Sequence, residues 1–261
     1  MASMPARVIA VTGASSGLGE ALARGYAARG TTLGLIGRDG ARLDECAQRC
    51  RAAGACAVVG VLDVRDVEAM QAWLRGFDAA HPIDLLIANA GVASTLATSN
   101  DWEDLARTRT IIEINFFGAL HAVQSVADRM RLRGTGQIAL VGSLAAIRGM
   151  AISPAYCASK AAIKAYAESV RPILRRDGVG LTLILPGFIK TAMSDVFPGN
   201  KPFMWSTDRA ATYIRRKLDA GRAEIAFPGP LAFGMRLLTL LPPSLADAIL
   251  GRLSYLPREE R

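Results

Sequence analysis

A tyrosine and a lysine four positions apart, Tyr156 and Lys160, are the residues of this sequence best suited to move a proton. On a helix such side chains lie on one face, so the two would point the same way. A free phenol has a pKa of about 10, too high for ready proton exchange at neutral pH. Because a nearby ammonium favours the phenolate, it would lower the pKa of Tyr156. The pair predicts a general acid/base, with a packed ring and a solvated amine as the alternative.

Two further polar residues are candidates for the same site. Ser143 follows a predicted buried strand, and Tyr156 lies in the first turn of a helix predicted over 154–176. A serine hydroxyl at that strand end can donate to a substrate oxygen while the phenol exchanges a proton with it. Asn115 lies inside an apolar helical pattern over 102–131, where an amide needs partners or costs stability. We treat it as a site candidate, with an ordinary core asparagine as the alternative.

A glycine-rich turn separates the first predicted strand, residues 7–11, from a helical pattern. The free N–H groups and the dipole of a helix N-terminus attract anions, so this arrangement predicts a dinucleotide site. We expect Gly13 to permit the tight turn, Gly17 the close approach of phosphate, and Gly19 close packing of helix on strand. The other turn residues expected at this site are Ser15, Ser16 and Leu18.

The next predicted strand, residues 32–36, ends in Gly37 and Arg38. Dinucleotide folds usually place an acidic residue at this strand tip to bind a ribose 2′-hydroxyl, whereas an arginine suits a 2′-phosphate. The sequence therefore favours NADP over NAD. An arginine that only caps a surface turn is the alternative.

Predicted strands and helices continue to alternate through the first half of the chain. Alternation of this kind indicates a parallel sheet with helices on both faces. Ligands bind such sheets at the carboxyl ends of the strands. Four candidate residues fall at these ends: Gly13, Arg38, Asp63 and Asn89.

Composition excludes several other classes of protein. The chain of 261 residues is 51% hydrophobic and carries a net charge of +8, but it shows no nucleic-acid-binding module. It contains no apolar run of about 18 residues, as a transmembrane helix would need, and its N-terminal apolar stretch is too short for a secretory signal. The four cysteines have neither metal-ligand nor disulfide-framework spacing. We expect a cytoplasmic protein without a metal.

The motifs occur together in a familiar order. TGASSGLG, NAG at 89–91, Asn115, Ser143, YxxxK at 156–160 and Pro186-Gly187 resemble the short-chain dehydrogenase/reductase family over residues 6 to about 228. The resemblance implies one doubly wound domain, spanning 1–261, around a seven-stranded parallel sheet. It implies an NADP(H)-dependent enzyme that interconverts a carbonyl and a secondary alcohol, acting as a homodimer or homotetramer.

The resemblance also implies a role for each site residue. Tyr156 would be the general acid/base, Ser143 would orient the substrate oxygen, and Lys160 would lower the pKa of Tyr156 and bind the nicotinamide ribose. Asn115 would hold a proton-relay water. The further coenzyme contacts that it implies are Asp63 and Val64 at the adenine, Asn89, Ala90 and Gly91 at the adenosine side, and Pro186, Gly187, Ile189 and Thr191 at the nicotinamide and pyrophosphate. An isomerase or dehydratase, and a dinucleotide sensor without turnover, are the rival functions.

Two segments bear on the substrate. Residues 188–205 are loop-like and rich in aromatic and methionine side chains, which predicts a lid over an apolar substrate, with ordinary packing as the alternative. Residues 229–261 form an apolar extension whose last helix would open at Ser244 with a capping box and run to Leu253. This extension could cover the substrate pocket, form a subunit interface or make peripheral membrane contact. We favour the first two uses.

Overall fold

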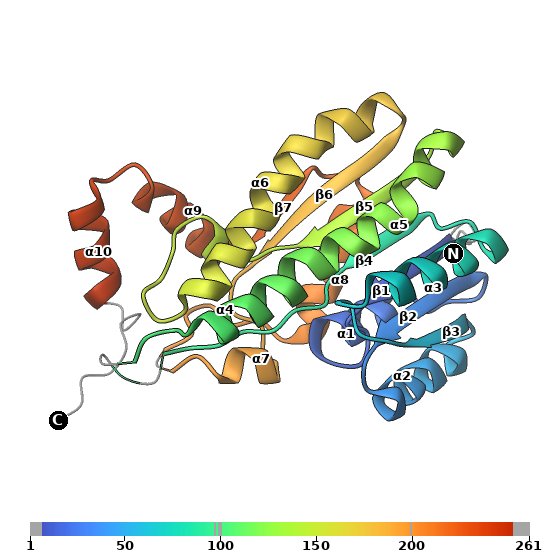
Figure 1. Ribbon diagram of the computed structural model, residues 1–261, viewed down its shortest axis with the longest axis horizontal. Coiled ribbons are helices and arrows are strands. Elements are labelled where there is room, and N and C mark those ends of the chain that lie inside the picture. Colours follow the sequence, from blue (N-terminus) through green and yellow to red (C-terminus); the bar gives the residue numbers. More distant parts are fainter. Residues whose placement is uncertain (1–6, 97, 99–100, 199, 253–261) are drawn as a thin grey trace.

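A seven-stranded parallel sheet organises the computed structural model, which describes residues 7–96, 98, 101–198 and 200–252 (Figure 1). The strand order is β3-β2-β1-β4-β5-β6-β7. The strands are β1 (Arg7–Thr12), β2 (Thr31–Gly37), β3 (Cys56–Val61), β4 (Leu85–Ala88), β5 (Gly136–Val141), β6 (Val179–Pro186) and β7 (Glu224–Phe227). The strand order reverses between β1 and β4, and doubly wound folds bind ligands at such a switch point. The predicted fold class is confirmed.

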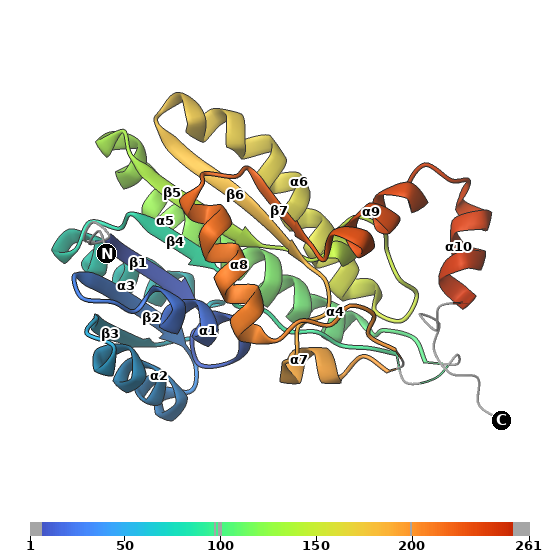
Figure 2. The same ribbon diagram turned by 180° about the vertical axis from the view of Figure 1, so that it is seen from behind.

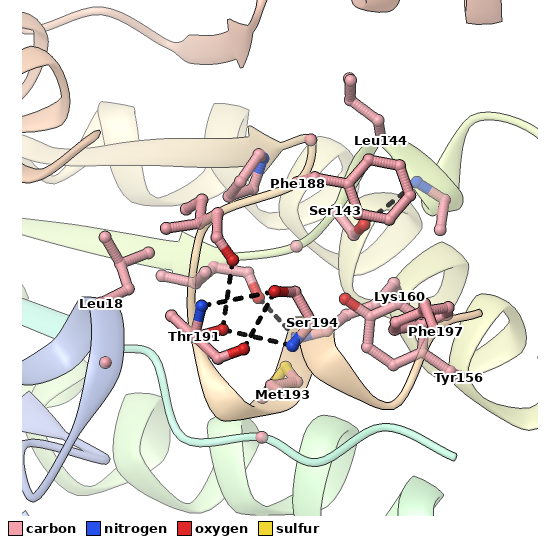
Figure 3. A pocket seen from close by; sticks show the side chains of 18 of the residues that line it. Leu18, Ser143, Leu144, Tyr156, Lys160, Phe188, Thr191, Met193, Ser194 and Phe197 are labelled. Atoms are coloured by element: carbon pink, nitrogen blue, oxygen red, sulfur yellow. Dashed lines mark hydrogen bonds between the residues drawn. The ribbon is translucent and has the colours of Figure 1, made fainter. Parts of the chain in front are cut away.

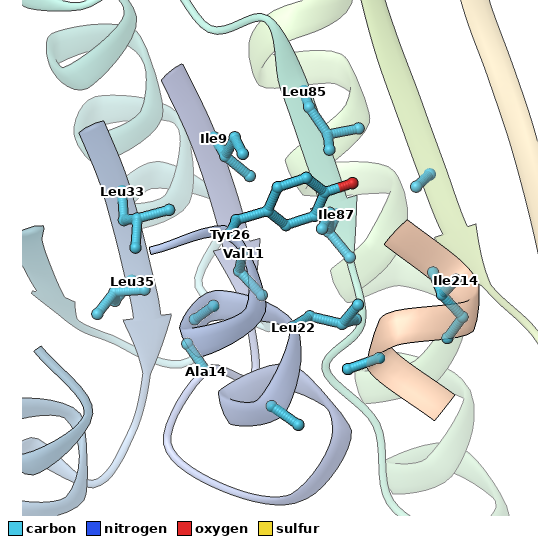
Figure 4. Packing of buried hydrophobic residues seen from close by; sticks show 14 of the residues in the cluster. Ile9, Val11, Ala14, Leu22, Tyr26, Leu33, Leu35, Leu85, Ile87 and Ile214 are labelled. Carbon is cyan, nitrogen blue, oxygen red and sulfur yellow. The ribbon is translucent and has the colours of Figure 1, made fainter. Parts of the chain in front are cut away.

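Helices cover both faces of the sheet. One face carries α1 (Gly17–Tyr26), α2 (Gly40–Ala52) and α8 (Thr207–Asp219), and the other carries α3 (Val67–Ala80), α5 (Gly118–Arg133) and α6 (Pro154–Arg176). Successive strand side chains point to opposite faces. Ile9 and Val11 therefore pack with Leu22 and Ile214 in one core, as Figure 4 shows, whereas Ala10 belongs to the other.

The helix predicted over 102–131 is present, beginning at Leu105 and continuing to Arg133, but its middle is not α-helical. The chain forms α4 (Leu105–Ile112), then a π-helical segment, Glu113–Phe117, and then α5. A π turn is a local widening that is found frequently at functional sites. Here it carries Asn115, whose buried side chain bonds to Val92 and Ser159 in other segments. We attribute the π-helical geometry to these distant partners.

Two helices, α9 (Gly229–Leu238) and α10 (Pro243–Arg252), follow β7 and form the C-terminal extension. Both views show α10 standing out from the body of the protein at the end of an arm formed with α9 (Figures 1 and 2). The predicted capping box at Ser244 is wrong, because the helix begins one residue earlier, at Pro243, and Asp247 pairs with Arg148. Proline suits a first helical position because it needs no N–H partner there. The predicted end at Leu253, like the rest of 253–261, lies outside the described residues.

Within the described ranges, no helix has the length and apolarity needed to cross a bilayer. The same part of the chain holds no group of three His, Cys, Asp or Glu side chains arranged to bind a metal ion. All four cysteines are unpaired.

Candidate active site

A cavity of about 1210 Å³ lies at the carboxyl ends of the central strands. It gathers most of the residues that the sequence nominated. Those that line it are Gly13, Ser15, Ser16, Gly17, Leu18, Arg38, Asp63, Val64, Asn89, Ala90, Gly91, Ser143, Tyr156, Lys160, Pro186, Gly187, Ile189 and Thr191. Gly19 and Asn115 are not in the cavity wall.

The glycine-rich turn after β1 leaves room that a side chain would fill. Gly13 has a φ of +68°, and a Cβ there would lie 2.9 Å from the Cα of Ala90. A Cβ on Gly19 would lie 2.1 Å from the carbonyl oxygen of Gly13, so Gly19 packs beneath the turn. Gly17 has a φ of +58°, and a Cβ there would lie 3.2 Å from the methyl group of Thr191. The turn and the N-terminus of α1 thus form a cradle that fits a pyrophosphate.

Thr12, which the sequence reasoning missed, joins this turn to β4. Its hydroxyl accepts hydrogen bonds from the backbone N–H groups of Asn89 and Ala90, both at 3.0 Å. The Asn89 side chain donates back to the carbonyl oxygen of Thr12 at 3.1 Å. The TG and NAG motifs are therefore one hydrogen-bonded unit across the switch point. A threonine at a strand end gives no signal by itself, since its partners lie about 77 residues away.

Two arginines line the far end of the cavity from Tyr156. Arg38 follows β2, and its guanidinium lies 3.7 Å from the Asp63 carboxylate. Arg42, which the sequence reasoning also missed, lies in the first turn of α2. A second arginine close after the tip of β2 was the available signal. A side-chain hydrogen bond from Arg65 is the main cause that lowers the pKa of Asp63.

Tyr156 and Lys160 are both buried in the first two turns of α6 and have 8% and 3% of their surface exposed. Burial raises the pKa of Tyr156 to about 12, and a hydrogen bond with Ser143 opposes that rise. Burial lowers the pKa of the Lys160 ammonium to about 8. The predicted lowering of the Tyr156 pKa by Lys160 does not appear here, because burial raises this pKa and Ser143 is the group that lowers it.

The two neighbouring polar groups have defined orientations. The Lys160 ammonium donates to the carbonyl oxygen of Val141 at 2.9 Å and lies 5.8 Å from the centre of the Tyr156 ring. The Ser143 hydroxyl accepts from the backbone N–H of Ala145 at 3.1 Å, which leaves its own proton to be donated toward the Tyr156 oxygen or a substrate. Figure 3 shows Ser143, Tyr156 and Lys160 at the same side of the cavity.

Asn115 lies behind this group. Its side-chain oxygen accepts from the backbone N–H of Val92 at 2.7 Å. Its amide donates to the carbonyl oxygen of Val92 and to the Ser159 hydroxyl, each at 2.9 Å. Both amide hydrogens are thus used, and the side chain ties the loop after the NAG motif to α6. The role of Asn115 in holding a relay water stays a prediction.

The N-terminus of α6 rests on a buried carboxylate that the sequence reasoning missed. Glu103 accepts a 2.6 Å hydrogen bond from the backbone N–H of Ala155 and another from the Ser94 hydroxyl. Ser153 donates in turn to the carbonyl oxygen of Ser94 at 2.5 Å. A negative charge at a helix N-terminus is stabilising. Glu103 therefore helps to place the first turn of α6, which carries Tyr156.

The aromatic segment 188–205 divides between cavity and core. Phe197 packs edge-on against the ring of Tyr156, at 5.8 Å between centroids, and Phe188 packs against Phe197 (Figure 3). Both line the cavity. Trp205 instead packs against Tyr213 and Phe227, in the core under α8. Part of the segment thus lines the cavity and part packs in the core, and its use as a substrate lid stays a prediction.

The switch-point cavity with its phosphate cradle defines a dinucleotide-binding protein of the doubly wound α/β class. Residues 7–200 match the short chain dehydrogenase family, and the chain belongs to that family. It is thus an oxidoreductase of the kind that uses a nicotinamide dinucleotide.

The chain is similar to one curated relative and to two solved structures. It is 39% identical to an uncharacterized oxidoreductase of Myxococcus xanthus over 97% of its own length and 100% of that protein. A metagenomic short-chain oxidoreductase solved with NADP is 27% identical, with a TM-score of 0.72 over 85% of this chain and 96% of the other. A Mycobacterium paratuberculosis short chain dehydrogenase solved with NAD is 23% identical, with a TM-score of 0.75 over 85% and 96%. The last similarity shows the fold alone.

Proposed function

We propose that this protein is an NADP(H)-dependent oxidoreductase that interconverts a carbonyl and a secondary alcohol, with Tyr156 as the general acid/base. The observation that carries the proposal is the placement of Ser143, Tyr156 and Lys160 in the wall of the cavity that also contains the glycine cradle. A proton donor and a hydride source must reach one carbon–oxygen bond, and this cavity can hold both.

The chain's own groups supply the proton and hold the oxygen. With a pKa of about 12, the Tyr156 phenol stays protonated at neutral pH, which is the form that carbonyl reduction needs. The Ser143 hydroxyl can donate to the same substrate oxygen and stabilise the charge that develops there. Lys160 keeps donors free beyond its bond to Val141, and we assign them to the nicotinamide ribose. The bound coenzyme would supply or accept the hydride at the carbon.

The preference for NADP rests on Arg38 and Arg42. Guanidinium groups bind phosphate with strong, charge-assisted hydrogen bonds, and both arginines line the end of the cavity beside the tip of β2. Gly37 occupies the strand tip where an acidic residue would bind a 2′-hydroxyl. Asp63 is already paired with Arg65 at 2.7 Å.

Replacement of Tyr156 tests the catalytic assignment. Tyr156→Phe removes only the hydroxyl, so we expect kcat to fall by at least about 10³-fold, while NADPH binds nearly as before. Consumption of NADPH across a panel of ketones and aldehydes gives the rates, and calorimetric titration gives the binding. Retained turnover in the variant would falsify the role of Tyr156. Tight NADPH binding with no turnover of any carbonyl by the wild type would favour a sensor.

Replacement of Arg38 tests the coenzyme assignment. The loss of one charge-assisted hydrogen bond corresponds to roughly 10-fold to 100-fold in affinity. We therefore expect Arg38→Ala to raise the KM for NADPH by about that factor and to leave the KM for NADH nearly unchanged. Arg29→Ala, a change of another exposed arginine outside the cavity wall, is the control. A wild-type enzyme that prefers NADH would contradict the assignment.

Two further expectations remain proposals. The apolar side chains of Leu132 and Ile173 are exposed on α5 and α6, which supports a homodimer or homotetramer and can be tested by light scattering. The four unpaired cysteines agree with a reducing compartment such as the cytoplasm.

A further inference from the structure

The charged groups of the cavity wall lie toward one part of it. Among the lining residues that the structure describes, the charged ones are Arg38, Arg42, Asp63 and Lys160. The first three lie at the proposed adenosine end, and Lys160 lies beside Tyr156. The lining residues that follow Pro186 in the chain carry no formal charge. A substrate with a carboxylate or phosphate would find no ionic partner on that side of the cavity.

The uncharged wall continues along the C-terminal arm. Leu231, Met235 and Leu238 of α9 line the cavity, and so does Leu250 of α10. A Cβ built on Gly187 would lie 3.0 Å from the side chain of Leu231. Apolar surface therefore begins at the turn that we assign to the nicotinamide, and it extends outward along the arm seen in Figures 1 and 2.

Specific contacts hold this arm in place. Ala232 and Met235 are buried in the core cluster on the α6 face of the sheet. Arg236 pairs with Glu224 of β7, and Asp247 of α10 pairs with Arg148 at 2.5 Å. The part of the cavity wall that the arm forms is therefore attached to the rest of the protein by these contacts.

The cavity opens to solvent between apolar side chains. Leu237 and Leu240 line it, yet 46% and 79% of their surfaces are exposed. An exposed apolar rim of this kind gains free energy when a hydrocarbon covers it. It offers nothing to a small polar substrate.

We propose that the arm α9–α10 forms an apolar channel that receives the hydrocarbon tail of a neutral ketone or secondary alcohol. This inference rests on the proposed function, because the reacting carbon is the one placed at Tyr156. The substrate class is thus a lipid-like carbonyl compound whose polar end reaches Ser143 and Tyr156 and whose tail runs past Leu238. Burial of each further methylene group should raise the binding affinity about fourfold.

A series of methyl ketones from 2-butanone to 2-decanone tests the channel. Binding is measured by calorimetry on the protein loaded with NADP⁺, which cannot reduce a ketone, and kcat/KM is measured separately with NADPH. We expect the affinity and kcat/KM to rise by roughly threefold to fourfold per added methylene. A response that stays flat or falls as the chain lengthens would overturn the channel.

A matched pair of variants locates the effect. Leu238→Glu puts a charge into the channel wall, whereas Leu245→Glu makes the same change at an exposed position of α10 outside it. We expect Leu238→Glu to lower the ratio of 2-decanone to 2-butanone affinity at least tenfold, and Leu245→Glu to leave that ratio unchanged. Equal ratios in the two variants would overturn the assignment to the channel. Binding that depends on chain length, without any turnover, would contradict the proposed function but still support the channel.

Discussion

At the scale of single residues, burial acts on the two central side chains in the same sense: it favours the neutral form of each. The Tyr156 phenol is stabilised as the protonated acid, and the Lys160 ammonium loses stability relative to the free amine. A neutral phenol is ready to give a proton, so the resting site is suited to reduce a carbonyl. The buried ammonium of Lys160, by contrast, lowers the stability of the folded protein.

The cost of Lys160 predicts a pH-dependent stability. Between about pH 8 and 10.5 the unfolded chain binds the Lys160 proton and the folded protein does not, so the free energy of unfolding rises with pH. Lys160→Met removes this contribution. From pH 8 to 9.5, below the titration of Tyr156, the wild type should gain roughly 1 to 2 kcal/mol relative to the variant. Urea unfolding at several pH values measures this gain, and parallel curves for the two proteins would contradict it.

At the scale of elements, α6 is the helix that the site depends on most. Its first two turns carry Tyr156 and Lys160, and its N-terminus is held by Glu103 from the chain segment before α4. The π-helical segment contributes Asn115, which bonds to Ser159 on the same helix. The position of the phenol is thus set by contacts from two segments that are far from it in the chain.

The contact between Glu103 and α6 can be tested without removing a catalytic group. Glu103→Gln keeps the shape of the side chain but loses the charge at the helix N-terminus, so we expect a stability loss of about 1 kcal/mol. We also expect kcat to fall severalfold while the KM for NADPH stays the same, because the phenol is displaced. Glu168→Gln, at an exposed position of α6, is the control. If both variants lose only stability, Glu103 does not position Tyr156.

At the scale of the whole molecule, stability and chemistry come from opposite ends of the sheet. The cavity lies at the carboxyl ends of the strands, while Asp78, at the end of α3, accepts from the backbone N–H of Ile83 just before β4. The fully buried Asp78 carboxylate also pairs with Arg133 at 2.9 Å and with Arg129 at 3.3 Å. These bonds join α3, α5 and the start of β4.

Removal of the Asp78 charge should destabilise the fold and spare the chemistry. Burial alone would raise the pKa of Asp78, but hydrogen bonds from Arg133 and Ile83 outweigh it and lower the pKa. The stabilisation is therefore present above the unfolded pKa of about 4 and is lost as the pH falls through the folded value. We expect Asp78→Asn to cost about 3 kcal/mol at pH 7, with kcat unchanged. Urea unfolding at neutral and acidic pH checks both the size and the pH trend.

The sequence predicted most of the fold because its signals are local. Apolar strands such as 7–11, the positive-φ glycines of the turn, and the proline at the start of α6 constrain the backbone through their nearest neighbours. It failed where distant partners decide the structure. The π-helical segment depends on Val92 and Ser159, and the start of α10 at Pro243 leaves Asp247 to pair with Arg148 rather than to complete a capping box.

By itself, the sequence determined the doubly wound class, the phosphate cradle and the residues nominated for proton transfer. Spacing and residue type are enough to specify these features. Only the tertiary structure showed that Thr12 and Asn89 form one unit, that Glu103 supports α6, and that burial raises the pKa of Tyr156. It also divided the aromatic segment between cavity and core. The physical reason is that burial and hydrogen bonding across the fold depend on which segments come into contact in space. The local periodicity of the sequence does not specify those contacts.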